Sequence, residues 1–422
     1  MVIPEHDVNS IQHIFIVGAK SIGQYGGYET FISRLIDEHK NVQNIKYHIA
    51  CKANGIGYMN EGKLSHIKVL KRNSTGEIIE FEYNNAHVFK IHCPNIGASV
   101  AIIYDKVAIE YCIDYCISNQ IENPIFYILS CRIGLFFGNI SRRIEHIGGR
   151  IFLNPDGHEW LRTKWTKPIR KYWKWSEKRM INYADLIICD SINIEKYVQK
   201  EYKHHNTTYI AYGGSLSQSL IPDDDPLFLS WLNKYMISIG DYYLVVGRLV
   251  PENNYETIIR EFMNCDSKRN LVLITNDNNK FLYNLEKKLH FKEDNRIKFA
   301  DSIYDAELLK KIRENAYGYI HGHEVGGTNP SLIEALCSTD INLVIDVEFN
   351  REVCLESVIY WNKVNGNLTN VIDMVEKMEI QKRIEYGELA KKRVEDAYTW
   401  KFVGERYLDV FLEERSENTD GQ

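Results

Sequence analysis

The residue pattern best suited to binding chemistry lies in residues 321–334, HGHEVGGTNPSLIE. Pro330 predicts the start of a helix, because proline favours the first helical position. The residues before it would then lie at the helix N-terminus, where the dipole and free N–H groups favour a phosphate. These candidate donor-binding residues are Gly327, Thr328 and Asn329, preceded by Gly326. Glu334, about one turn further on, is expected to reach a ribose or sugar hydroxyl on the same side.

A second glycine pair, Gly26 and Gly27, follows an apolar run at 13–17 and precedes an amphipathic stretch at 31–39. The glycines of this region match neither the G-x-G-x-x-G fingerprint nor a P-loop. A glycine pair before a helix leaves backbone N–H groups open to an anion or a sugar hydroxyl. A tight turn between strand and helix explains the pair equally well, so both interpretations stay open.

The third chemical signal is the loop NPDGHEWLR at 154–162, which follows the apolar residues 151–153. Loops at the carboxyl ends of strands carry much of the chemistry of α/β proteins. A structural turn accounts for the proline and the glycine, but not for Asp156, His158 and Glu159 beside them. These three residues are our candidate catalytic groups, and the sequence does not choose between them.

No metal site is predicted. His321 and His323 are two residues apart at a strand end, but no third ligand lies nearby. The acidic run 223–225 falls in a predicted linker. The nine cysteines show no zinc-knuckle spacing, and we interpret them as small buried residues in a reducing compartment.

Residues 161–180 form a strongly basic segment, with eight basic residues against one glutamate. The segment carries +7, so the rest of the chain carries −13 of the total −6. Basic residues interleaved with tryptophan suit an anionic bilayer surface, whereas a solvated basic helix with core tryptophans is the alternative. The candidate membrane-facing residues are Lys171, Lys174, Lys178 and Trp173. Nucleic acid is disfavoured as a partner, because no other basic surface accompanies this patch.

These signals sit in a regular alternation of strands and helices, which implies βαβ units and parallel sheets. Expected strands in the first half are 13–17, 46–51, 88–92, 125–129, 151–153 and 186–189. Expected strands in the second half are 242–246, 271–275, 296–300, 317–321 and 341–347, with helices at 255–263, 279–289, 305–314 and 329–337. Asn253 and Glu256 suggest a capping box. Residues 217–225 are the best linker candidate.

The chain has 422 residues, 44% of them hydrophobic and 26% charged, which excludes a disordered or low-complexity protein. The start has no basic region followed by an apolar core, so no signal peptide is expected. The longest apolar stretch, 126–137, is too short to span a bilayer. We therefore expect a cytoplasmic protein, either soluble or held at the inner face of the cytoplasmic membrane.

The chain resembles the GT-B-fold family-4 retaining glycosyltransferases, and more narrowly the bacterial polysaccharide β1-4 rhamnosyltransferases. The motifs that carry the resemblance are GQYGGYETF, NPDGHEWLRTKW, ADLIICDS, YYLVVGRLVPENNYETII, HGHEVGGTNPSLIEAL and the closing YTW. The resemblance implies an α/β fold of two Rossmann-like domains facing a cleft. The acceptor domain would span 1–215, with 398–422 crossing back to it as a C-terminal helix. The nucleotide-sugar domain would span 238–397.

By motif, the resemblance places Arg248 at the donor phosphates and Glu334 at the nucleotide ribose. The histidine that the family carries in its acceptor domain falls near Asp156 to His158. Two positions depart from the family pattern: its first paired glutamate is Gly326 here, and its usual lysine is Asn254.

The function implied is transfer of a sugar from a nucleotide-sugar to a polyprenyl-linked glycan acceptor, with retention and without metal or cofactor. The first expectation is rhamnose from dTDP-rhamnose, in surface or capsular polysaccharide synthesis. Two alternatives remain: a sugar-nucleotide epimerase of the same architecture, and an inactive nucleotide- or glycan-binding protein. Both departures from the family pattern motivate the second alternative.

Overall fold

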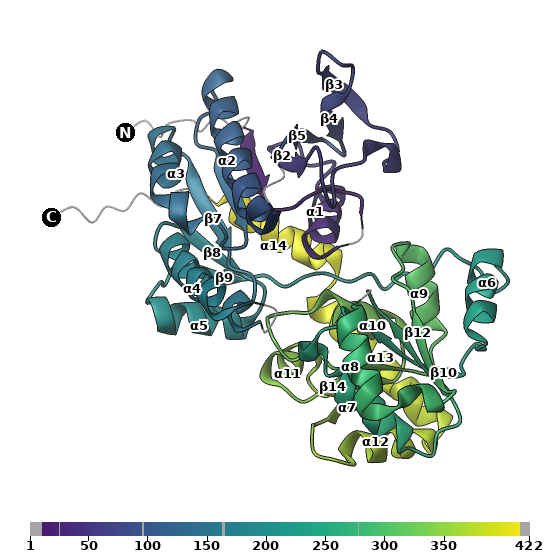
Figure 1. Cartoon of the computed structure of the whole chain (residues 1–422). Coiled ribbons are helices and arrows are strands. Elements are labelled where there is room, and N and C mark those ends of the chain that lie inside the picture. The colour runs from purple at the N-terminus through teal and green to yellow at the C-terminus, as the bar shows by residue number, and fades with distance from the viewer. Residues whose placement is uncertain (1–10, 25, 95–96, 163–164, 277, 414–422) are drawn as a thin grey trace, which may run out of the picture.

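The computed structural model describes residues 11–413 except 25, 95–96, 163–164 and 277, and its strands form two separate sheets (Figure 1). The first sheet has the order β3-β4-β5-β2-β1-β6-β7-β8-β9, and the second β12-β11-β10-β13-β14-β15. All pairings are parallel except those of the β3-β4-β5 meander. The predicted two-domain α/β architecture is therefore confirmed.

The first domain comprises the nine-stranded sheet and the helices on its two faces. Its strands are β1 (Gln12–Val17), β2 (Ile45–Lys52), β3 (Lys68–Arg72), β4 (Ile78–Tyr83), β5 (Ala86–Ile91), β6 (Ile125–Leu129), β7 (Arg150–Asn154), β8 (Leu186–Cys189) and β9 (Thr207–Tyr209). Its helices are α1 (Gly27–Glu38), α2 (Val100–Ser118), α3 (Gly134–His146), α4 (Lys167–Ile181) and α5 (Ile192–Tyr202), with short 3₁₀ turns η1 (Glu61–Lys63), η2 (Gly97–Ser99) and η3 (Glu159–Leu161).

The second domain comprises the six-stranded sheet and its covering helices. Its strands are β10 (Tyr242–Val246), β11 (Asn270–Ile274), β12 (Ile297–Ala300), β13 (Gly318–His321), β14 (Asn342–Ile345) and β15 (Ile359–Trp361). Its helices are α6 (Pro226–Tyr235), α7 (Tyr255–Met263), α8 (Asn279–Leu289), α9 (Ala306–Glu314), α10 (Pro330–Ser338), α11 (Glu348–Cys354), α12 (Asn367–Glu376) and α13 (Ile380–Ala397), with 3₁₀ turns η4 (Pro251–Asn253) and η5 (Phe291–Glu293).

Strand β1 sends alternate side chains to opposite faces of the sheet, as strand geometry requires. Ile14 and Ile16 pack with α1 on one face, whereas Phe15 and Val17 pack with α2 on the other. All four side chains are fully buried. Burial on both faces explains why the central strands read as continuous apolar runs in the sequence.

The predicted capping box at Asn253 is wrong. Helix α7 begins at Tyr255, and its N-cap is Asn254 in a left-handed conformation with φ of 55°. The amide of Asn253 instead donates to the backbone oxygen of Arg248 at 2.7 Å, and its side-chain oxygen lies 2.6 Å from His323. Asn253 therefore ties two loops of the second domain together.

The last helix, α14 (Trp400–Leu412), packs on the first domain, although α13 before it belongs to the second (Figure 1). Its Tyr407 hydroxyl lies 2.8 Å from that of Tyr127 on β6, and both side chains are buried. The backbone oxygen of Gly404 lies 2.9 Å from the His39 ring. The predicted crossing back is confirmed for residues 400–412, while 414–422 lie outside the described residues.

A buried histidine group lies under α2 in the first domain. His48 on β2 is 3% exposed, and its ring stacks on Phe15 with 4.3 Å between centroids. One of its ring nitrogens lies 2.8 Å from a ring nitrogen of His13. Burial above all, and then the charges of His13, His87 and Lys46, hold the pKa of His48 well below its usual range.

We expect stability to fall as the pH drops below about 6.5, because His48 takes up a proton only in the unfolded chain. Above that pH both states are neutral at this site, so it adds no pH dependence. Each pH unit below the unfolded pKa costs about 1.4 kcal/mol until the folded pKa is reached.

His48→Phe keeps the stacking and removes this titration, so its Tm should fall less than the wild-type Tm between about pH 7.5 and about pH 5.5. The exposed His146→Gln is the control and should keep the wild-type loss. Equal losses in all three proteins would contradict the assignment.

Candidate functional site

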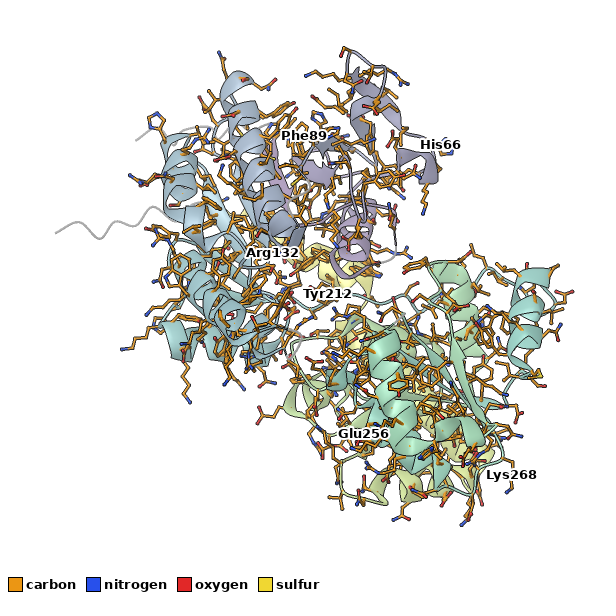
Figure 2. All side chains as sticks on the ribbon, viewed as in Figure 1. His66, Phe89, Arg132, Tyr212, Glu256 and Lys268 are labelled. Carbon is orange, nitrogen blue, oxygen red and sulfur yellow. The ribbon has the colours of Figure 1, made fainter. Side chains whose placement is uncertain are left out.

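The carboxyl ends of strands from both sheets open on one cavity of about 510 Å³ between the domains. Figure 2 labels Arg132 and Tyr212, two of its lining residues, where the two domains meet. Eight of the predicted site residues line it: Gly26, Gly27, Asp156, Arg248, Gly327, Thr328, Asn329 and Glu334. A neighbouring cavity of about 560 Å³ shares Gly27, Tyr212 and Glu334 with it. The fold thus gathers residues as far apart in the chain as Gly26 and Glu334.

The predicted phosphate loop leads into α10 as expected. Pro330 is the first helical residue, and the side chain of the N-cap Asn329 accepts a hydrogen bond from the Ser331 N–H at 2.9 Å. Gly326 has φ of 121°, a conformation that side-chain-bearing residues rarely adopt. The loop therefore places the N-terminus of a nine-residue helix at the cavity.

The same loop of the second domain packs closely against the first domain. A Cβ on Gly157 would lie 2.6 Å from the Cα of Gly326, and a Cβ on Gly327 would collide with the Asp190 carboxylate. The Thr328 hydroxyl donates to the backbone oxygen of Asp190. The glycines are thus required by close packing between the domains.

Asp190, which follows β8, is the main site residue that sequence reasoning missed. Its side chain is 3% exposed yet lines the cavity, and its Oδ1 has no hydrogen-bond partner among the described residues. Burial, and then the charges of Asp156 and Glu352, raise the pKa of Asp190 well above its usual range. The available signal was its place directly after an apolar strand, the same logic that singled out Asp156.

Of the three candidate catalytic residues, only Asp156 lines this cavity. Asp156 has φ of 62°, and its carboxylate accepts a hydrogen bond from the Gly157 N–H at 2.9 Å. The His158 ring instead packs 4.3 Å from that of Tyr197, and burial, then the charge of Lys174, lowers its pKa.

Glu159, the third candidate, accepts a hydrogen bond from the Trp165 indole at 2.8 Å and pairs with Arg162 at 2.7 Å. The structure thus brings Asp156 to the cavity, whereas His158 and Glu159 contact their own domain. The catalytic roles of all three stay predictions.

Arg248 and Glu334 lie on the second-domain side. Arg248 is exposed in the cavity, and partial burial, then the charge of Arg162, lowers its pKa. Glu334 forms an ion pair at 2.6 Å with Arg313, which is 3% exposed and also donates to the Ser331 hydroxyl at 3.2 Å. A buried guanidinium therefore holds the carboxylate of Glu334 in place.

His321 and His323 are both neutral at physiological pH. Burial lowers the pKa of His321 to about 3 and that of His323 to about 4. Among the described residues, no group of three or more histidine, cysteine or acidic side chains could hold a metal ion.

The basic segment forms α4, and its lysines are not equivalent. The Lys174 ammonium lies over the rings of Trp160, Tyr197 and Tyr202 at 4.6, 4.7 and 4.9 Å, and pairs with Glu201 at 3.0 Å. Lys174 is therefore engaged within the domain, which corrects its predicted place on a membrane-facing surface.

Lys171 and Lys178 are exposed, as predicted. Trp173 is half-buried, and the centroid of its ring lies 6.1 Å from that of Trp165. Lys164 of this segment lies outside the described residues. Within the part of the chain that is described, no helix combines the length and apolarity needed to cross a membrane.

Comparison with known proteins supports this architecture. A model of a domain of unknown function, DUF1972, matches residues 11–215. No curated protein matches the sequence. Sucrose-phosphate synthase from Thermosynechococcus elongatus superposes with a TM-score of 0.72 at 13% identity, covering 95% of this chain and 98% of that one.

Two further solved structures cover as much of the chain. A glycosyltransferase from Rickettsia africae has a TM-score of 0.68 at 10% identity and covers 95% of this chain and 98% of its own. Anabaena HepE in complex with UDP has a TM-score of 0.63 at 11% identity, with coverage of 95% and 99%. Together with the two parallel sheets, these neighbours confirm the predicted GT-B fold.

The contact between Gly327 and Asp190 generates a test. A Cβ at Gly327 should force the domains apart, because overpacking of this kind costs about 1–3 kcal/mol, and about 1.4 kcal/mol is a tenfold change in population. Gly327→Ala should therefore increase the radius of gyration measured by small-angle X-ray scattering.

Gly27→Ala is the matched control, because a Cβ at Gly27 would meet no atom within 4 Å. Its radius of gyration should equal that of the wild type. An unchanged value in Gly327→Ala as well would show that the loop adapts without opening the domains.

Proposed function

We propose that this protein is a glycosyltransferase that moves a sugar from a nucleotide-sugar to a hydroxyl group of a glycan acceptor bound in the cleft. The observation that carries the proposal is the distribution of charge in the interdomain cavity. Arg248 and the α10 N-terminus belong to the second-domain wall, and the carboxyl groups of Asp156 and Asp190 belong to the first-domain wall. The likeness to GT-B structures, among them HepE in complex with UDP, supports a nucleotide-sugar as the donor.

The two walls suit the charges that the reaction develops. The bond between the anomeric carbon and the diphosphate breaks, a bond to the acceptor oxygen forms, and the acceptor proton passes to the departing phosphate. The leaving diphosphate gains negative charge, which Arg248 and the α10 N–H groups stabilise without a metal ion. Attack from the side of the departing phosphate gives retention of configuration.

The paired side chains of Glu334 and Arg313 would bind the nucleotide ribose. Arg313 is buried and contacts Glu334 at 2.6 Å, so the carboxylate is oriented before the donor arrives. An oriented carboxylate accepts hydrogen bonds from two adjacent hydroxyls at a smaller entropic cost than a mobile one. This arrangement supports the ribose role expected from the resemblance.

Asp156 is the candidate that we propose to orient the acceptor hydroxyl, because it lines the cavity and the other two candidates do not. Asp190 lines the same cavity, and after burial the charge of Asp156 is the largest influence that raises its pKa. The donor we propose first is dTDP-rhamnose and the acceptor a polyprenyl-linked glycan of surface polysaccharide synthesis. No resident cofactor takes part, since the nucleotide-sugar is a substrate.

The proposal is tested by offering purified protein a panel of nucleotide-sugars with a polyprenyl-diphosphate-linked sugar and detecting the product by mass spectrometry. Arg248→Ala should reduce transfer about a hundredfold, because it removes a charge-stabilising donor. Arg248→Lys should restore transfer only in part, because an ammonium lacks the planar fork. EDTA should have no effect.

Arg72→Ala is the control, since Arg72 lies on β3 and lines neither cavity. Conversion of a nucleotide-sugar without acceptor would indicate the epimerase instead. Donor binding without transfer to any acceptor would indicate an inactive binding protein.

We also propose that α4 docks reversibly on an anionic membrane. Lys171, Trp175 and Lys178 follow helical spacing along one face, and Trp175 is 44% exposed. Arg179 lies 5.7 Å from the Trp175 ring, and the nearby Leu135 is 61% exposed. Exposed apolar and basic side chains together suit the interface of an anionic bilayer.

Lys171→Glu combined with Lys178→Glu should weaken co-sedimentation with phosphatidylglycerol vesicles at least about tenfold, since each basic residue contributes about 1 kcal/mol. Transfer to the lipid-linked acceptor should fall, whereas transfer to a short soluble analogue should not. Lys287→Glu with Lys292→Glu, two exposed lysines of the second domain, is the charge-matched control. Undiminished vesicle binding by the α4 variant would refute docking through this face.

A further inference from the structure

Arg162 of the first domain lines the interdomain cavity, and only part of its guanidinium group is engaged in an ion pair. Its Nε pairs with Glu159 at 2.7 Å, and the Trp165 indole fixes the other oxygen of that carboxylate. The terminal nitrogens of Arg162 make no hydrogen bond to any described residue. The side chain is 17% exposed and lines the cavity. The ion pair therefore fixes the Nε of Arg162, and its terminal nitrogens can donate hydrogen bonds to a ligand in the cavity.

The positive charge of Arg162 acts across the cleft on the second domain. After burial, which has the larger effect, this charge lowers the pKa of Arg248 and that of His323, both of which line the same cavity. Two guanidinium groups that approach each other from separate domains repel, unless an anion lies between them. A diphosphate is an anion of the right charge and shape, because guanidinium binds phosphate oxygens in pairs.

The second domain supplies few cations of its own. Among its described residues that line this cavity, Arg248 is the only one with a permanent positive charge. Asn254, six residues later, is 8% exposed and donates to the backbone oxygen of Gly322 at 2.8 Å. Asn254 therefore holds the backbone and does not provide charge to the cavity.

Arg132, another cation on the first-domain wall, is engaged by other groups of its own domain. It pairs with Asp105 at 2.9 Å and donates to the backbone oxygen of Gly18 at 3.0 Å. The charge of Arg162, by contrast, is the largest influence after burial on the pKa of both Arg248 and His323. Of these two arginines, Arg162 is thus the better placed to share an anion with Arg248.

We propose that Arg162 is the second cation of the diphosphate site and reaches the donor across the cleft from the acceptor domain. This inference rests on the proposed function and adds a binding residue to it. Because Arg162 and Arg248 belong to different domains, a bound diphosphate joins the two domains. A donor of this kind would therefore favour the closed arrangement in which Gly326 and Gly327 contact the first domain.

The test measures the affinity of UDP and dTDP by isothermal titration calorimetry, for the wild type and for Arg162→Gln. We expect Kd to rise about tenfold in the variant, because a hydrogen-bonded charge is lost. Arg248→Gln should weaken binding at least as much. Lys171→Gln is the charge-matched control on the exposed face of α4 and should leave Kd within about twofold of the wild type.

Glu159→Gln separates binding from loop support, because it breaks the same ion pair but keeps the cation. We expect Glu159→Gln to hold Kd within about threefold of the wild type. Equal weakening in Glu159→Gln and Arg162→Gln would overturn the inference, since the loop alone would then explain the loss. Equal weakening in Lys171→Gln would overturn it as well.

The remaining outcomes separate this inference from the proposed function. Binding that is lost in Arg248→Gln but unchanged in Arg162→Gln would overturn the inference alone. Wild-type protein that binds neither nucleotide would overturn the proposed donor site and this inference together.

Discussion

The close contact between the loop before α10 and the ends of β7 and β8 is the constraint on which the cleft depends. Backbone meets backbone at Gly157 and Gly326, and Gly327 lies against the Asp190 carboxylate. The Thr328 hydroxyl completes the contact by donating to the backbone of Asp190. Because no side chain fits between these segments, the two domains approach closely enough for one cavity to be lined by both.

The chain connects the domains twice at nearly the same place, and this geometry aligns the contact. Gly214, in the outgoing segment, forms an isolated bridge with Thr399, in the returning segment. A Cβ on Gly213 would lie within 3 Å of Trp400, so the two crossings are tightly packed. Beyond the crossing, α14 is anchored through the buried Tyr127 and Tyr407 hydroxyls. Two adjacent crossings therefore tie the domains together beside the cavity.

Electrostatics divides the cavity along the domain boundary. Asp156 and Asp190 come from the first domain, and burial, followed by the charge of Asp156, raises the pKa of Asp190. Arg248 and the α10 N-terminus come from the second domain, whereas the cations Lys20, Arg132 and Arg162 lie with the carboxylates of the first. A ligand with an anionic part and a hydroxyl-rich part matches this division. Domain closure is therefore needed to bring the two parts of such a ligand to their partners.

Much of the fold was readable from local patterns. The apolar runs at 242–246 and 125–129 are strands β10 and β6 with the expected bounds, and Pro330 begins α10 as predicted. These features depend on residues a few positions apart, so a single sequence contains the information. The hairpin of β3 and β4 was not predicted, because β3 is entirely exposed and so lacks the alternation that marks a half-buried strand.

What the sequence by itself determined is which residues lie at strand ends and helix starts, including Asp156, Arg248 and Asn329. Only the tertiary structure decided which of them share a cavity. His158 packs against Tyr197, and Lys174 lies over a group of aromatic rings. Asp190 and Arg162, by contrast, line the cavity. The physical reason is that side-chain partners are set by packing between segments far apart in the chain, which no local periodicity records.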